Sequence, residues 1–174
     1  MWKEIGTSLK EEWTLEPSAW FLRLTSGLMT QNPDGGTSPT FAKETDAIRT
    51  AIETYHLGSN KLSPVCYALA SRSDPKALSI LEKIESKNPD SKVQGVAALG
   101  MAMIMKSFGE DPEILEKRLT LLRKAIIQSA DVELNGTPVS KLADDELYII
   151  LHLVKGRVAP DLQGFDSGKR PIRL

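Results

Sequence analysis

Apolar residues recur along most of this chain at the spacing of one helix face. Ala77, Ile80, Leu81 and Ile84 form an i, i+3, i+4, i+7 series, which places all four on the same side of a helix. By this criterion the sequence predicts helices over residues 17–29, 39–56, 64–71, 93–105 and 142–154, and two more that begin at Pro75 and Pro112.

Ser-Pro and Asp-Pro pairs mark where several of these helices are expected to begin. Proline suits the first helical position, and a preceding Ser or Asp accepts hydrogen bonds from free N–H groups of the first turn. The pairs are Ser38-Pro39, Ser63-Pro64, Asp74-Pro75 and Asp111-Pro112. Ser91 and Gln94 add a capping-box pattern. These starts predict short helices joined by short loops.

The segment from Val93 to Met105 is apolar nearly all the way round. A helix of this kind is usually surrounded by other helices, so we expect it at the centre of the fold, with Gly95 and Gly100 allowing close backbone approach. A membrane-spanning helix is the other interpretation, and the segment is too short for it.

The last third of the chain mixes strand and helix signals. Asn135-Gly136 is a hairpin-type turn between short extended stretches. In the helix that follows, the acidic run 144–146 is expected in the first turn, where the helix dipole favours negative charge. Its buried stripe is predicted to comprise Leu147, Ile150, Leu151 and Val154, and Gly156 is expected to end it.

Residues 156–174, GRVAPDLQGFDSGKRPIRL, read differently from the helices. Residues 158–162 are expected to be extended around Pro160, residues 166–169 to form a turn, and residues 171–174 to begin a second extended run. The predicted fold is therefore all-α, an irregular antiparallel helical bundle or a short stack of helix pairs, with a C-terminal β-hairpin. A two-stranded hairpin alone is only marginally stable, so this one needs a sheet to join.

Composition narrows the function classes. Of 174 residues, 41% are hydrophobic and 26% charged, as in ordinary globular proteins, and 22 basic against 23 acidic residues give a net charge of −1. That balance offers no general attraction to nucleic acid. The opening residues 1–13 are too charged for a secretory signal peptide, and the sequence predicts no membrane-spanning segment.

No residues combine into a recognisable catalytic, cofactor or metal site. Cys66 is the single cysteine and is either a reactive thiol or, as we expect, a packed core residue. His56 and His152 lie far apart in sequence and are expected to pack at or near the surface rather than bind a metal.

Other suggestive residues also have structural interpretations, which we prefer. We expect helix-terminal charge for Asp144, Asp145 and Glu146 rather than a cation site, and core packing for Met101, Met103 and Met105 rather than a pliable binding surface. Gly35-Gly36 predicts a flexible connection and no phosphate loop. We expect a solvated surface at Lys155, Arg157, Lys169, Arg170 and Arg173. Trp2, Trp13 and Trp20 would be partner anchors if exposed, but we expect them to pack the first helices onto the bundle.

The C-terminal segment resembles the opening of thioredoxin-like thiol-disulfide oxidoreductases of the redoxin (TlpA-like) group. The shared positions are Gly156, Ala159-Pro160-Asp161, Asp166, Gly168-Lys169 and residues 172–174. A weaker similarity to the helical region of some bacterial redoxins covers residues 62–103 and 130–162. The family continues with a strand and a WCxxC motif, which have no counterpart here, so no catalytic residue can be carried over.

The resemblance implies two parts, a helical accessory domain over residues 1–155 and the first hairpin of a thioredoxin-like domain over residues 156–174. It implies a non-catalytic role, with the chain's own downstream thioredoxin-like domain or a protein client as partner, and a periplasmic or cell-envelope location. Terminal strands would also allow a dimer. An independent helical protein–protein interaction module with no redox role is the alternative.

Overall fold

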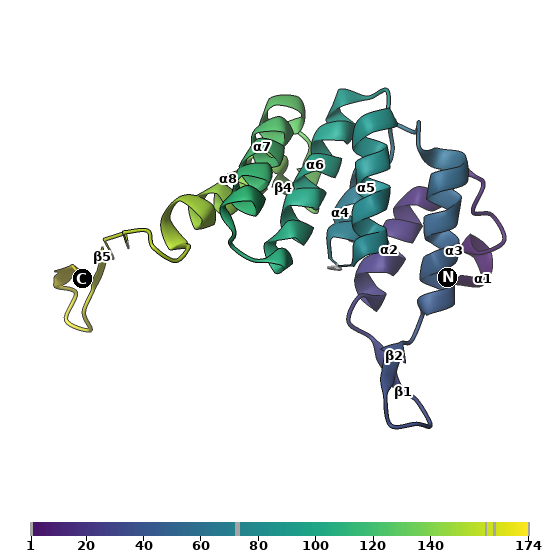
Figure 1. The fold of residues 1–174 in the computed structure, drawn as a ribbon, viewed down its shortest axis with the longest axis horizontal. Helices are drawn as coiled ribbons and strands as arrows, with labels where there is room; N and C mark the ends of the chain where they lie inside the picture. The colour runs from purple at the N-terminus through teal and green to yellow at the C-terminus, as the bar shows by residue number, and fades with distance from the viewer. Residues whose placement is uncertain (1, 72–73, 159, 162, 174) are drawn as a thin grey trace.

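The computed structural model describes residues 2–71, 74–158, 160–161 and 163–173, and the fold is mainly helical (Figure 1). The α-helices are α1 (Trp2–Ile5), α2 (Leu15–Thr25), α3 (Ala42–Ala51), α4 (Ser63–Ala70), α5 (Pro75–Lys87), α6 (Ser91–Met105), α7 (Pro112–Ser129) and α8 (Val139–Tyr148). Short 3-10 turns span Glu12–Thr14 and Lys106–Phe108, and π-helical turns, Ile52–His56 and Ile149–Leu153, extend α3 and α8.

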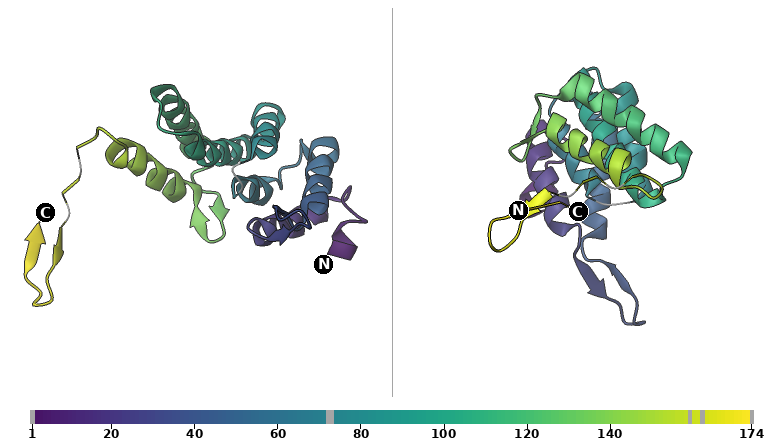
Figure 2. Two further views of the ribbon diagram at one scale, coloured as in Figure 1. Left: turned by 60° about the horizontal axis from the view of Figure 1, so that its bottom comes forward. Right: turned by 90° about the vertical axis from the view of Figure 1, so that its left-hand side faces the viewer.

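The helices form two rows, as Figure 2 shows. Helices α2, α4, α6 and α8 contact one another in that order, and α3, α5 and α7 lie in the second row. Pairing across the rows is tightest around α6, which contacts α5 and α7 as well as its row neighbours. The predicted all-α fold, with helix pairs in a short stack and a C-terminal hairpin, is confirmed.

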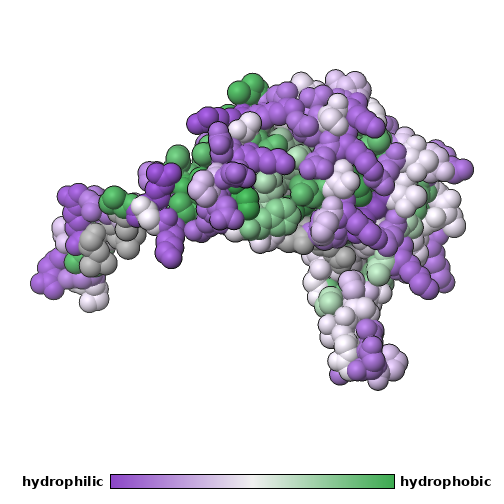
Figure 3. Space-filling view, viewed as in Figure 1, coloured by the Kyte–Doolittle hydropathy of each residue, from purple (hydrophilic) through white to green (hydrophobic). Residues whose placement is uncertain are grey.

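Helix α6 is the centre of the hydrophobic core, as its sequence predicts. From Val93 to Met105, every residue except Gln94 and Met103 is buried. A Cβ on Gly95 would lie 2.5 Å from Ser129 Oγ of α7, and one on Gly100 would lie 3.1 Å from the Cys66 carbonyl oxygen of α4. Both glycines therefore allow the close helix contacts expected of them. The surface of the molecule seen from the viewpoint of Figure 1 is mainly hydrophilic, with hydrophobic residues visible between the hydrophilic ones near its middle (Figure 3).

A β-hairpin around residue 35 takes the place of the predicted end of one helix and the predicted start of the next. The helix expected over 17–29 ends at Thr25, and the one expected over 39–56 begins at Ala42. Between them β1 (Met29–Gln31) pairs antiparallel with β2 (Thr37–Pro39). Pro39 thus ends a strand and starts no helix. Gly35 adopts φ +86°, which an ordinary residue rarely does, so this glycine makes the turn of a hairpin rather than a flexible connection.

Asp74 caps α5 as predicted, but Ser63 lies inside α4 and, among the described residues, neither Ser63 nor Asp111 makes the side-chain capping bond expected of it. The starts of α6 and α8 also differ from the sequence prediction. Asp90, not Ser91, caps α6, because its carboxylate accepts from Lys92 N at 2.8 Å. The Gln94 side chain donates instead to the Asn88 carbonyl oxygen at 2.7 Å. Helix α8 begins at Val139, directly after a strand, so the acidic run 144–146 lies in its second turn and not its first.

The β3–β4 hairpin occurs where the sequence predicts it, and so do the turn and second strand of the C-terminal hairpin, whereas its first strand begins at Gln163, after the predicted run 158–162. Strands β3 (Glu133–Leu134) and β4 (Thr137–Pro138) flank a turn with positive φ at Asn135 and Gly136. Strands β5 (Gln163–Phe165) and β6 (Pro171–Arg173) form the C-terminal hairpin. The extended segment predicted over 158–162 includes residues 159 and 162, which lie outside the described residues.

Candidate interaction surfaces

The C-terminal hairpin is closed by a well-bonded turn. The Asp166 carboxylate accepts from the backbone N–H groups of Gly168 and Arg170, each at 2.8 Å, and from Arg170 Nε at 2.7 Å. These bonds, chiefly the backbone one from Arg170, lower the pKa of Asp166. Six residues pair across the strands as Gln163 with Arg173, Gly164 with Ile172 and Phe165 with Pro171.

This hairpin stands away from the helices (Figures 1 and 2). All six strand residues are exposed. Among the described residues, the polar side-chain bonds of residues 160–173 stay within that segment, including an ion pair between Arg173 and Asp161, whereas Lys155 N, before it, donates to Glu110. Phe165 is 74% exposed on one face and Ile172 is 48% exposed on the other. Both faces and both strand edges are therefore open to a partner.

The basic residues of the tail lie on a solvated surface, as predicted. All five, namely Lys155, Arg157, Lys169, Arg170 and Arg173, are exposed. Two of them pair with aspartates of the same tail, Arg170 with Asp166 and Arg173 with Asp161.

The prediction that all three tryptophans pack onto the bundle is wrong for two of them. Trp2 packs on Phe21 with 5.3 Å between ring centroids, as expected. Trp13 and Trp20 are 55% and 52% exposed. Helical spacing places Trp20 and Leu24 opposite the buried stripe of α2, which other apolar residues already occupy. Two aromatic anchors thus face solvent near the N-terminus.

Cys66 is a core residue, as predicted. It lies in α4 with no exposed surface, beneath the close approach of Gly100. Burial raises the pKa of the Cys66 thiol to about 12, because the thiolate would lose its hydration.

We therefore expect Cys66 to be inert in the folded protein. At pH 8 an aromatic disulfide reagent should release no chromophore over an hour from the native chain, because the reactive species is the thiolate. In denaturant it should release one equivalent within minutes. Rapid native labelling would show that α4 opens, and a Cys66→Ser variant gives the background.

The two histidines lie in the two π-helical turns. His56 is 5% exposed and its Nε2 lies 2.7 Å from the Leu9 carbonyl oxygen, which ties the N-terminal segment to the end of α3. His152 is exposed and stacks on Tyr148 with 4.8 Å between centroids. One is buried and the other lies on the surface, so they are not brought together.

The remaining candidates have structural roles. Met101 and Met105 are buried and Met103 is half-buried, which confirms core packing. Asp144 and Asp145 are exposed, whereas Glu146 binds Arg118 and Lys106. Leu151, predicted in the buried stripe of α8, is 48% exposed because the π-helical turn shifts it out of register.

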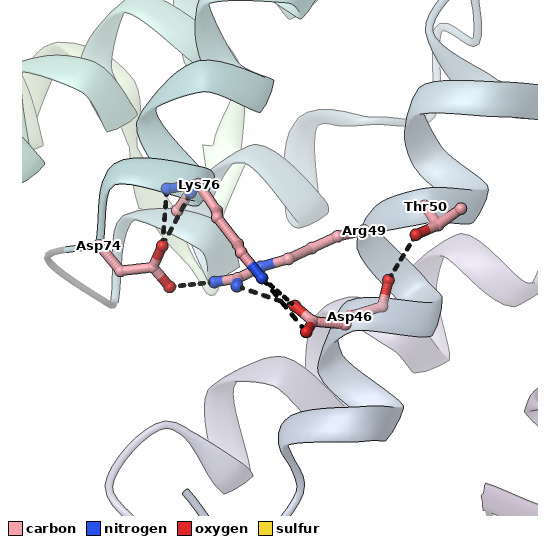
Figure 4. A network of polar contacts seen from close by, with 6 residues as sticks. Asp46, Arg49, Thr50, Asp74 and Lys76 are labelled. Carbon is pink, nitrogen blue, oxygen red and sulfur yellow. Dashed lines mark hydrogen bonds and ion pairs between the residues drawn. The ribbon is translucent and has the colours of Figure 1, made fainter.

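A network of charges joins α3 to α5 (Figure 4). Arg49 is 7% exposed and donates to the Asp74 carboxylate, while Lys76 reaches Asp46 at 3.3 Å. Asp74 Oδ1 also caps α5 by accepting from Lys76 N at 2.8 Å. Burial acts to raise the pKa of Asp74, but the hydrogen bonds from Arg49 and the α5 backbone outweigh it and lower that pKa.

This network predicts acid sensitivity. A carboxyl group whose pKa is lower in the folded than in the unfolded chain stabilises the fold above its unfolded pKa of about 3.9, and that contribution is lost as the pH falls. Asn caps a helix as well as Asp does, so Asp74→Asn removes mainly the charge. We expect urea unfolding to show a deficit for the variant at pH 7 that shrinks towards pH 3. A pH-independent deficit would contradict this.

A hollow near the N-terminal half of the fold brings together residues that the sequence analysis did not connect. It has a volume of about 310 Å³ and lies where α2, α4 and the β3–β4 turn meet. Its lining includes Trp20, Tyr67, Glu16 and Glu133. The four-residue spacing of Glu16 and Trp20 shows that they share a helix face, but the contribution of the β3–β4 turn depends on the tertiary fold.

Comparison with protein-family profiles, curated proteins and solved structures finds no match for this chain. Within the described ranges, no helix is long and apolar enough to cross a membrane. The same residues contain no group of three or more His, Cys, Asp or Glu side chains placed to hold a metal ion.

Proposed function

We propose that this chain is a non-catalytic helical accessory region of a thioredoxin-like thiol-disulfide oxidoreductase, in which β5 and β6 pair with the sheet of the redox domain. The observation that carries the proposal is the hairpin itself, which stands free of the helices with every strand residue exposed. Its sequence, with Ala159-Pro160-Asp161 before the strands and Gly168-Lys169 in the turn, is the part that resembles that family.

Physical chemistry favours a sheet as the partner of this hairpin. Isolated two-stranded hairpins are marginal in water, and exposed strand edges present unpaired N–H and C=O groups. Phe165 and Ile172 project apolar surface from opposite faces. A sheet that accepts the hairpin at one edge, covered on its faces by helices, would satisfy the backbone and bury both side chains.

The helical region would position the redox domain or recognise a client. The last turns of α8 support positioning, because Tyr148, Leu151 and Leu153 are each about half exposed. They lie close in sequence to the hairpin. Earlier in α8, the exposed residues are polar, namely Lys141, Asp144 and Asp145. The apolar surface is thus confined to the end of the helix that leads to the hairpin.

Hydrogen exchange measured by mass spectrometry tests the proposal. In the 174-residue chain, amides of residues 163–173 should exchange within seconds. In a protein that extends through the downstream reading frame, they should be protected at least about a hundredfold, because ladder hydrogen bonds close both strands. The β1–β2 hairpin, also exposed, is the matched control and should exchange alike in both proteins.

Two results would contradict the proposal. One is a downstream reading frame without a CxxC pair, and the other is unchanged exchange over residues 163–173. Insulin reduction by the 174-residue chain should be absent, since disulfide exchange requires an accessible thiolate. Turnover in that assay would overturn the non-catalytic assignment. Protection that rises with protein concentration would indicate a dimer through the terminal strands instead.

An independent protein–protein interaction module is the second candidate function. The exposed Trp13 and Trp20 favour it, because tryptophans exposed on a surface are common anchors at interfaces. Under this alternative, deletion of residues 157–174 leaves partner binding intact. Under the leading proposal, the deletion abolishes docking of the redox domain.

A further inference from the structure

The hollow between α2, α4 and the β3–β4 turn has an aromatic wall. Trp20 is 52% exposed and Tyr67 is half-buried beside it, on neighbouring helices. Ala19, Pro64 and Leu134 complete the apolar part of the lining. Trp20 and Tyr67 both line this hollow, and the face of an aromatic ring attracts cations because it carries negative electrostatic potential.

Two carboxylates at the same hollow have no protein partner. Among the described residues, neither Glu16 nor Glu133 makes a side-chain hydrogen bond or ion pair. Arg23 is the one basic residue among the described residues of the lining, and the Asn135 side chain already holds it. Two carboxylates against one guanidinium leave a net negative charge. The hollow is therefore complementary to a positive group and repels an anion.

Two exposed leucines follow Trp20 along the chain, Leu24 on the same face of α2 and Leu28 just past the helix end, and we call this pair the apolar track. Leu24, one turn beyond Trp20, is 53% exposed, and Leu28 just past the helix end is 47% exposed. A free amine would use the hollow alone and leave this track uncovered. A peptide segment with a basic side chain followed by apolar residues would fill both. This distinguishes a protein segment from a small cationic molecule.

We propose that this hollow binds a lysine or arginine side chain of a partner protein, presented on a segment with adjacent apolar residues. The charged group lies against Trp20 and Tyr67 and donates charge-assisted hydrogen bonds to the carboxylates of Glu16 and Glu133. The hollow is separate from the C-terminal hairpin, so this inference does not depend on what the hairpin joins.

The probe is the peptide acetyl-Gly-Arg-Leu-Leu-Gly-amide, titrated into the 174-residue protein by calorimetry. Its match carries citrulline in place of arginine, which keeps the shape and removes the charge. We expect the arginine peptide to bind at least about tenfold more tightly, the difference that one cation–π contact with a charged hydrogen bond supplies. Raising the salt from about 0.05 to 0.5 M should weaken the binding.

Variants locate the site. Glu16→Gln with Glu133→Gln, and separately Trp20→Ala, should each weaken binding at least about tenfold. The controls are Glu113→Gln, an exposed carboxylate on α7, and Phe108→Ala, an exposed aromatic residue that does not line the hollow, and both should leave binding unchanged. All five substituted positions are exposed, so circular dichroism should show folded proteins throughout.

Three results would overturn the inference. They are equal affinity for the arginine and citrulline peptides, equal loss in the hollow and control variants, and no binding at about 1 mM peptide, an affinity that a single such contact is expected to reach. None of these three results bears on the proposal for the C-terminal hairpin, because that proposal is tested by a different measurement, hydrogen exchange over residues 163–173.

Discussion

Arg118→Met is expected to lower the free energy of unfolding by about 3–5 kcal/mol, the cost typical of breaking a buried ion pair from one side. Arg118 is 2% exposed; its Nε donates to the Ala102 carbonyl oxygen at 3.1 Å and its Nη2 to Glu146 at 2.7 Å. At the end of α6 the N–H of Lys106 donates to the carbonyl oxygens of Met103 and Ile104 rather than to that of Ala102, so Arg118 bonds a carbonyl that the helix leaves free. One side chain thus joins α6, α7 and α8.

Urea unfolding followed by circular dichroism measures this effect. Arg118→Lys keeps the charge but loses the fork of donors, so it should recover only part of the stability. Glu146→Gln tests the other side of the pair, and the double variant with Arg118→Met should cost less than the two single changes added together. Additive losses would show that the two side chains act independently.

Gly95→Ala is expected to destabilise the fold by about 1–2 kcal/mol, although alanine is the better helix former. Overpacking costs about 1–3 kcal/mol, while the gain in helix propensity is at most about 1 kcal/mol. The added Cβ would lie 2.5 Å from Ser129 Oγ and 2.9 Å from Gln128 Cβ, so α6 and α7 must move apart.

Thermal or urea unfolding of matched variants checks the cause. Adding Ser129→Ala removes the nearest atom but leaves the Cβ contacts, so it should rescue stability only in part. Gly27→Ala, where no atom lies within 4 Å of the new Cβ, is the control and should change stability little. A stabilised Gly95→Ala protein would mean that the α6–α7 contact is looser than described.

Helices with strong apolar periodicity could be predicted from the sequence. The helix starts that were predicted wrongly are explained by the residues immediately around them. The Pro75 start and the central position of the 93–105 segment depend on the chain's own pattern, and both are correct. The helix start predicted at Pro39 was wrong because a Ser-Pro pair also fits the end of an edge strand, where proline's missing N–H is not needed. The prediction that Ser91 caps α6 was wrong because Asp90, one residue earlier, offers the stronger acceptor.

The candidate surfaces were predicted unevenly. The terminal hairpin has a local signature, the Asp166-Gly168-Lys169 turn between extended residues, so sequence sufficed. The hollow around Trp20 brings together residues more than a hundred positions apart in sequence, from α2 and the β3–β4 turn. Which face of α2 is covered depends on α4, which packs against it, and that cannot be read from the spacing within α2.

The helix stack is held unevenly along its length. Helix α3 meets α5 through the ion pairs of Arg49 with Asp74, Lys76 with Asp46 and Lys83 with Glu53, and a hollow lies between the two helices. Around α6 the contacts are apolar and close. Under tension applied to its two ends, the molecule should therefore yield in steps, with the contact between α3 and α5 opening at low force and in a salt-dependent manner, while the apolar middle resists until it ruptures as one body.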